Sequence, residues 1–233
     1  MALILNIETA TDICSVCLAH DGNLLCIAEN KNPKSHASVL TPLIQKVLNK
    51  SKIDFHQLDA VAVSKGPGSY TGLRIGVAAA KGICYATGKQ LLAINTLKAM
   101  TSFFIEENQK KIQNEKENIL FVPLIDARRM EVYSAVFDYD LNFVRNTKAE
   151  ILNENSFSDL SAKKKLYFLG DGTAKLKSFI KAKSNFILTD NFIVSSQGII
   201  SLSENAYLNK QFEDIAYFEP FYLKEFLATS AIK

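Results

Sequence analysis

The residues best placed to do chemistry form a glycine-rich stretch, residues 66–72, which reads GPGSYTG. It follows a short apolar run and precedes a helical pattern, and a glycine turn in that position exposes backbone N–H groups that can bind phosphate. A P-loop would continue with Gly-Lys-Ser or Gly-Lys-Thr, and no such lysine follows. The dinucleotide-binding spacing would need glycine at Thr71 and an acidic residue near position 92, and both are missing. The stretch therefore favours a tight turn with close packing, and a nucleotide contact at Gly68 and Ser69 is the alternative.

A second polar turn, Glu8-Thr9-Ala10-Thr11, follows the first apolar strand. Side-chain oxygens at a strand end can hold a phosphate or a metal ion, so Glu8 and Thr9 join the candidate nucleotide contacts. A bare surface turn is the commoner explanation of such a sequence, and it is the one we favour here.

No set of residues predicts a metal site or a covalent catalyst. His20, His36 and His56 are too far apart for two of them to share one helical turn. Cys14 and Cys17 fall in one apparent strand, where their odd separation places them on opposite faces. No Ser-His-Asp or Cys-His pair stands in a motif context. We expect no catalytic residue, no bound metal and four free cysteines.

The elements that must position these residues fall into two similar halves. The first half predicts three strands (3–7, 13–19, 24–29), a helix (35–50), a strand (60–63), a helix to Tyr85, a strand (91–95) and a helix (96–107). The second half predicts strands at 119–125, 131–137 and 141–145, then a strand at 166–169, helices at 173–183 and 195–209, and an aromatic tail at 219–223.

A strand, an acidic residue, a turn and a second strand occur at Glu8 and again at Asp126. Internal duplication of this kind predicts an α/β fold of two duplicated lobes, with mixed sheets and flanking helices. The polar stretch 106–118 is the expected boundary, which gives an N-terminal lobe, 1–107, that carries the partner-binding helices and a C-terminal lobe, 108–233.

The helix after the glycine-rich turn has a face with almost no side chains, formed by Gly72, Gly76, Ala79, Ala80 and Gly82. Glycine inside a helix costs about 0.5–1 kcal/mol relative to alanine, so we expect another helix to approach closely there. An apolar stripe on residues 39–48 would lie beside it, and the two helices together would form a docking face. Gly76→Leu is then expected to abolish association and leave the fold intact. The residues predicted to contact a partner are Leu40, Leu43, Val47, Tyr70, Arg74, Val77 and Ala78.

The bulk composition is that of an ordinary cytoplasmic protein. The 233 residues are 48% hydrophobic and carry a net charge of +3, which is too balanced to predict nucleic-acid binding by this chain alone. The apolar start lacks a preceding basic residue and Glu8 interrupts it, so we expect a strand there and not a signal peptide. No apolar run approaches the roughly 18 residues of a membrane span.

Four motifs resemble the TsaB (YeaZ) family: residues 7–11 with 14–16, the run GPGSYTGLRIG, residues 126–128 with 131–133, and Glu219-Pro220 with Tyr222-Leu223. The resemblance spans nearly the whole chain. It implies the two-lobed fold of the sugar kinase, Hsp70 and actin superfamily (ASKHA, ribonuclease H-like). It also implies a role in transferring threonylcarbamoyl from threonylcarbamoyl-AMP to N6 of adenosine 37, in tRNAs that read codons beginning with A.

In that family the paralogue TsaD carries the chemistry on a metal held by an HxxxH motif, and TsaB supports it together with the ATPase TsaE. At the corresponding position this chain reads Asn95-Thr96-Leu97-Lys98-Ala99-Met100, without a metal ligand. The resemblance thus implies a non-catalytic subunit that binds TsaD-type and TsaE-type proteins and forms a homodimer when isolated. It contacts tRNA only within the complex, has no membrane role, and has ATP or ADP, if any, at the shared interface.

A rival interpretation is an independent ATPase or phosphotransferase of the same fold, with Glu8, Thr9 and Asp126 around a nucleotide. Glu8 stands where many family members have aspartate, and its extra methylene would shift any carboxylate contact. A peptidase is a third reading, for which no nucleophile or metal set is present.

Overall fold

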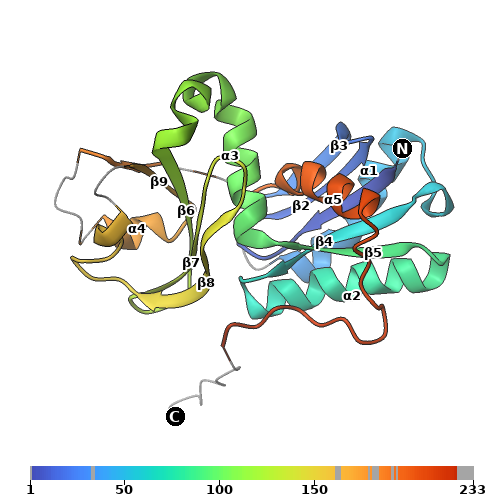
Figure 1. The fold of residues 1–233 in the computed structure, drawn as a ribbon. Coiled ribbons are helices and arrows are strands. Elements are labelled where there is room, and N and C mark those ends of the chain that lie inside the picture. The colour runs from blue at the N-terminus through green and yellow to red at the C-terminus, as the bar shows by residue number, and fades with distance from the viewer. Residues whose placement is uncertain are drawn as a thin grey trace, which may run out of the picture.

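The computed structural model describes residues 2–32, 35–160, 164–177, 179, 184–189, 192 and 194–224. The chain forms two lobes, each built on a mixed five-stranded sheet (Figure 1). None of the helices in these ranges is long and apolar enough to cross a membrane.

The first sheet has the strand order β3-β2-β1-β4-β5. Its strands are β1 (Leu3–Glu8), β2 (Cys14–His20), β3 (Asn23–Asn30), β4 (Ala60–Gly66) and β5 (Gln90–Asn95), and its helices are α1 (His36–Ser51), η1 (Phe55–Gln57) and α2 (Tyr70–Thr87). All six residues of β1 are buried, as expected for a strand whose sheet is covered on both faces.

The second sheet has the order β10-β9-β6-β7-β8. Its elements are β6 (Ile119–Asp126), β7 (Glu131–Phe137), β8 (Phe143–Ile151), η3 (Ser158–Leu160), β9 (Lys165–Leu169), α4 (Thr173–Leu176) and β10 (Phe186–Leu188). In both sheets the first three strands are antiparallel and the last two are parallel additions. The predicted duplication is therefore confirmed, and Glu8 at the end of β1 corresponds to Asp126 at the end of β6.

Helix α3 (Thr96–Ile112) lies between the two sheets (Figure 1) and is followed by η2 (Gln113–Asn118). Its Ala99 packs with the first sheet, whereas its Met100 and Phe104 pack with the second. The stretch 106–118, expected as a polar connection, is thus helical, and residue 107 lies inside α3.

The end of the chain returns to the first lobe. Helices η4 (Ser196–Ile199) and α5 (Ile200–Leu208) take the place of the single helix predicted at 195–209. Ile199 and Ala206 pack with Ile4 and Leu92 on the sheet face opposite α1 and α2. By packing, this last segment belongs to the N-terminal lobe, so a division at residue 107 does not separate the two cores. The helix predicted at 173–183 ends at Leu176 as α4, and residues 178 and 180–183 lie outside the described residues.

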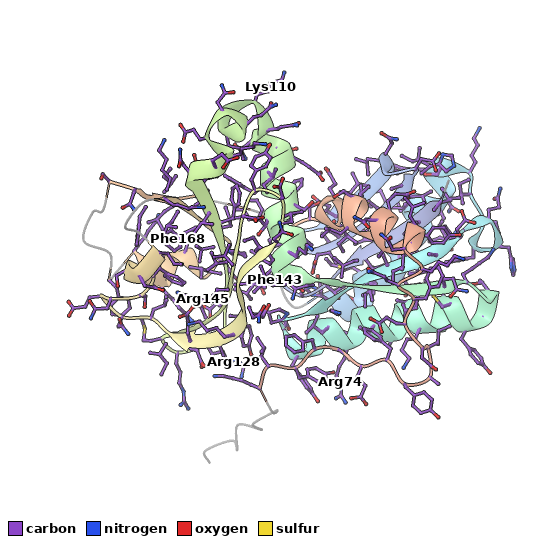
Figure 2. The ribbon with its side chains drawn as sticks, viewed as in Figure 1. Arg74, Lys110, Arg128, Phe143, Arg145 and Phe168 are labelled. Carbon is purple, nitrogen blue, oxygen red and sulfur yellow. The ribbon has the colours of Figure 1, made fainter. Side chains whose placement is uncertain are left out.

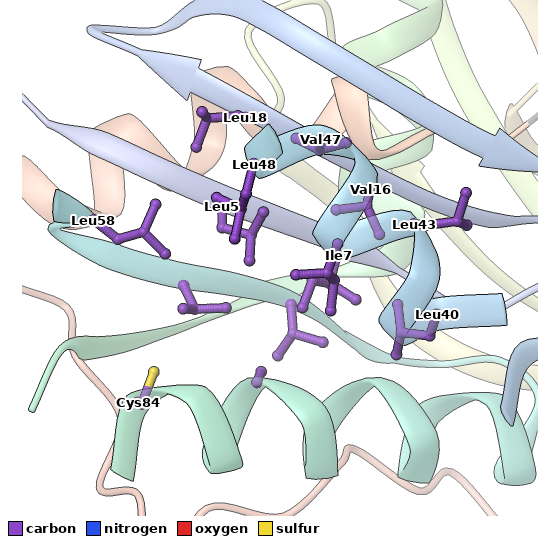
Figure 3. Close-up of a cluster of buried hydrophobic side chains, with 14 of the residues drawn as sticks. Leu5, Ile7, Val16, Leu18, Leu40, Leu43, Val47, Leu48, Leu58 and Cys84 are labelled. Atoms are coloured by element: carbon purple, nitrogen blue, oxygen red, sulfur yellow. The ribbon is translucent and has the colours of Figure 1, made fainter. Parts of the chain in front are cut away.

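Helices α1 and α2 cover one face of the first sheet with a single apolar core (Figure 3). Leu40, Leu43 and Val47 on α1 and Val77 on α2 are between 0% and 8% exposed and belong to this core. Their predicted place on an exposed docking face is therefore wrong. An amphipathic stripe buries itself against the nearest apolar sheet, and the stripe of α1 does so here within its own lobe.

Candidate functional site

The glycine-rich helix start packs on the turn between β1 and β2. A Cβ at Gly72 would overlap the carbonyl oxygen of Thr9, and a Cβ at Gly76 would overlap Oγ1 of the same threonine. At Gly68 a Cβ would overlap the Ala10 carbonyl. The close approach predicted for this helix is confirmed at these glycines, but its occupant is a turn of the same lobe and not a partner helix. Gly76→Leu would consequently disturb the fold itself, and the earlier expectation for that variant is wrong.

Three backbone N–H groups of the loop, those of Gly66, Ser69 and Gly72, are hydrogen-bonded inside the lobe. Ser69 donates its N–H to the Ala10 carbonyl at 2.7 Å, and its Oγ accepts the N–H of Gly72 at 3.3 Å as the N-cap of α2. Gly66, at φ +112°, donates its N–H to Oγ1 of Thr96 at 3.2 Å. These contacts account for the loop as a tight turn. A nucleotide contact at Gly68 and Ser69 stays a prediction.

Glu8 and Thr9 are fully buried, so the bare surface turn favoured from the sequence is wrong. One carboxylate oxygen of Glu8 accepts from the Ala10 N–H at 2.6 Å and from Ser64 Oγ at 3.0 Å. The other oxygen has no partner among the described residues. Burial raises the pKa of Glu8 to about 7, although these hydrogen bonds act to lower it. The carboxyl group is thus able to keep its proton near neutral pH.

Asp126, the counterpart of Glu8, is exposed, and its carboxylate is hydrogen-bonded within the second lobe. Its Oδ1 accepts from the Arg128 N–H at 2.7 Å and from Lys175 Nζ at 2.6 Å. Asp171, on the loop before α4, accepts the Asp126 N–H at 2.9 Å, and burial raises its pKa, with the charges of Asp126 and Asp12 adding to the rise. Asp12 belongs to the first lobe, so its negative charge acts on Asp171 across the space between the lobes. Among the described residues no group of three or more His, Cys, Asp or Glu is placed to hold a metal.

Helix α2 presents a second row of small residues to the outside. The residues 72, 76 and 80 form the buried row, whereas Ala78, Gly82 and Ala86 form an exposed row one third of a turn away. A Cβ built at Gly82 has no neighbouring atom within 4 Å in the described part of the chain. Tyr85, beside this row, is 84% exposed. We call the exposed residues Arg74, Ala78, Gly82, Tyr85 and Ala86 the α2 face.

Of the predicted interface residues, Tyr70, Arg74 and Ala78 reach the surface. The guanidinium of Arg74 lies 4.8 Å from the ring centre of Tyr70, and the ring of Tyr222 lies 4.9 Å from it on the C-terminal segment. Figure 2 shows Arg74 and Arg128 on the same side of the molecule, one from each lobe. Gly82, which the sequence placed on the small-residue face, is exposed. Tyr85 and Ala86 were not among the predicted contacts, although Ala86 continues the four-residue spacing from Ala78 and Gly82.

The duplicated sheets, the shared α3 and the helix pair on the first sheet define the class of the molecule. Its fold is the two-lobed fold of the sugar kinase, Hsp70 and actin type. The family model for TsaD, tRNA N6-adenosine threonylcarbamoyltransferase, matches residues 30–231. The chain is 29% identical to the tRNA threonylcarbamoyladenosine biosynthesis protein TsaB of Haemophilus influenzae, over 95% of this chain and 93% of that protein.

A second relative, the TsaB protein of Buchnera aphidicola subsp. Schizaphis graminum, is 30% identical over 75% of this chain and 81% of its own length. The solved structure of YeaZ from Pseudomonas aeruginosa shares the fold, with a TM-score of 0.77 at 22% identity over 96% of this chain and 100% of that one. The chain therefore belongs to the family that the TsaD model describes, and within that family to the TsaB (YeaZ) group.

Proposed function

We propose that the chain is a non-catalytic subunit in the synthesis of threonylcarbamoyladenosine in tRNA, and that it binds a TsaD-type protein through the α2 face. The observation that carries the proposal is the exposed row of Ala78, Gly82 and Ala86 beside a nearly fully exposed tyrosine. Small side chains let two helices approach closely, and tyrosine is enriched among the residues that dominate binding energy.

The segment after β5 supports the accessory role. A TsaD-type protein would carry its HxxxH motif at this place, whereas this chain has residues that cap helices and turns. Asn95 accepts the Lys98 N–H at 3.0 Å as the N-cap of α3, and Thr96 accepts the Gly66 N–H. These side chains hold two turns in place and none of them is a metal ligand.

A partner of the same duplicated fold offers an equivalent helix, so the contact would relate the two α2 helices by an approximate two-fold axis. The same face accounts for a homodimer when the chain is isolated. A TsaE-type protein joins the pair, and tRNA is contacted within the complex, because a net charge of +3 gives this chain little attraction of its own. A tRNA-modifying complex works in the cytoplasm.

We assign any ATP or ADP to the interface between the subunits and not to this chain alone. Glu8 and Thr9 are buried behind the glycine-rich turn, and the N–H groups of Ser69 and Gly72 have acceptors within the lobe. The rival function as an independent ATPase would need these groups to face a nucleotide.

The test places a charge at the centre of the α2 face. Ala78→Glu buries a carboxylate against the partner, and we expect its affinity for the TsaD-type protein, measured by calorimetry, to fall at least about tenfold. Ala174→Glu is the matched control, because Ala174 is an exposed helical alanine in the second lobe. Equal affinities for the two variants would refute docking through this face.

A further inference from the structure

The C-terminal segment, residues 213–224, runs along the outside of the first lobe (Figure 1). It begins beside β5, where Glu213 donates its N–H to the Leu91 carbonyl at 2.9 Å. It then passes α2, where Lys81 Nζ donates to the Phe218 carbonyl at 3.0 Å. At the end of β4, Phe221 donates its N–H to the Lys65 carbonyl at 2.7 Å.

An aromatic contact anchors the segment at the start of α2. The Tyr222 ring lies 4.9 Å from the Tyr70 ring, on which the Arg74 guanidinium also rests. Gly66 leaves room for the segment, because a Cβ there would come within 2.7 Å of the Phe221 carbonyl oxygen. The C-terminal segment is thus held at the β4–α2 turn by a ring contact with Tyr70 and by the space that Gly66 leaves for its backbone.

The far end of the segment reaches the second lobe. Lys224 Nζ forms an ion pair with the Glu131 carboxylate at the start of β7. A cavity of about 30 Å³, enough for a single water, is enclosed between Pro67 and Gly68 of the first lobe, Tyr133 of the second, and residues 221–224. The segment therefore closes the space between the lobes next to the glycine-rich turn.

The chain joins the lobes covalently through α3 and again between β10 and η4. Because α3 packs on both sheets, it can serve as the pivot of a lobe rotation. The C-terminal segment makes a third connection, on the side of the molecule where α2 lies (Figure 1). A contact away from a pivot resists rotation about it.

We propose that residues 213–224 are a strap that holds the two lobes at a fixed angle and closes the cavity beside Gly68. All the contacts of the strap lie within this chain, so this proposal can be tested separately from docking through the α2 face.

The test releases the anchor with Tyr222→Ala. Tyr217→Ala is the matched control, because Tyr217 belongs to the same segment and is 85% exposed. Hydrogen exchange of the Phe221 N–H is expected to accelerate at least about tenfold in Tyr222→Ala and to stay unchanged in the control. A chain shortened to end at Phe218 lacks Tyr222 and therefore removes the same anchor in a second way.

The lobe angle is measured with spin labels on His56→Cys and Asp140→Cys, one exposed site in each lobe, in a Cys26→Ser background. Burial raises the pKa of Cys14 and Cys17 to about 12 and that of Cys84 to about 11, so these thiols react slowly with the label. We expect one narrow distance distribution in the native chain and in Tyr217→Ala, and a broadened or shifted one in Tyr222→Ala and in the shortened chain. A narrow, unshifted distribution in all four would overturn the proposal.

Discussion

The carboxyl group of Glu8 lies in a fully buried site where, among the residues that the structure describes, only one of its two oxygens is hydrogen-bonded. The ionised form would carry a negative charge away from water with hydrogen bonds to one oxygen only. This cost raises the pKa of Glu8 from 4.5 to about 7. The Glu8 side chain places its carboxyl group within hydrogen-bonding distance of Ser64 Oγ and the Ala10 N–H. The residue supports the turn that α2 packs on.

This environment predicts a pH-dependent stability. Between pH 4.5 and 7 the unfolded chain releases the Glu8 proton while the folded chain keeps it. The contribution of Glu8 is therefore fully present below pH 4.5 and is lost as the pH rises through 7, by on the order of 3 kcal/mol. Urea unfolding at pH 5 and at pH 8 should show a smaller stability difference for Glu8→Gln than for the native chain. An identical difference in both proteins would contradict the buried, protonated carboxyl group.

At the scale of the element, α2 is a helix with two rows of small residues that do different work. The row of Gly72, Gly76 and Ala80 fits the turn at Thr9 and Ala10 and the core, whereas the row of Ala78, Gly82 and Ala86 faces outward. The first row fixes the position of the helix on the sheet. Because the helix position is fixed, the second row lies at a fixed position on the surface, where a partner can contact it.

Two glycine substitutions separate the rows. Gly76→Ala places a methyl group on Oγ1 of Thr9 and should destabilise the protein by about 1–3 kcal/mol through overpacking. The methyl group of Gly82→Ala meets no atom of the described residues within 4 Å. This variant should stabilise α2 by about 0.5–1 kcal/mol, because alanine loses less backbone entropy. Chemical denaturation measures both changes. Destabilisation of similar size by the two variants would show that the rows have been assigned incorrectly.

The sequence was sufficient for the duplication and for nine of the ten strands, but not for β10, for the order of the strands, or for the direction in which each helix face points. Alternation, glycine turns and the repeated acidic strand end are local signals, whereas the order of strands in a sheet is set by contacts between distant segments. Leu40, Leu43 and Val47 have the spacing of an apolar stripe, and that spacing is the same whether the stripe packs on its own sheet or on another chain. The turn at Thr9 is packed against Gly72 and Gly76, which lie more than sixty residues further along. The Tyr70–Tyr222 contact joins still more distant residues and has no local signature.

At the scale of the whole molecule, the duplicated sheets are not two independent domains. The second lobe is inserted between α3 and η4, and the chain then returns to complete the first. The apolar face formed by Ala2, Ile4, Ala60, Ala62 and Leu92 is covered by η4, α5 and α3. The N-terminal lobe therefore depends on residues near both ends of the sequence.

A fragment of residues 1–112 tests this dependence. Without η4, α5 and the C-terminal segment, it would expose the face at Ile4, Ala62 and Leu92, and burial of such apolar surface is the main favourable term in folding. We expect the fragment to give a poorly dispersed amide NMR spectrum. Joining residues 194–224 to it through a flexible Gly/Ser linker of about 20 residues should restore dispersion, because the linker leaves the packing surfaces free to meet. The control joins the same linker and residues in shuffled order, and a well-dispersed spectrum from the bare fragment would show that the lobe folds without its returning helix.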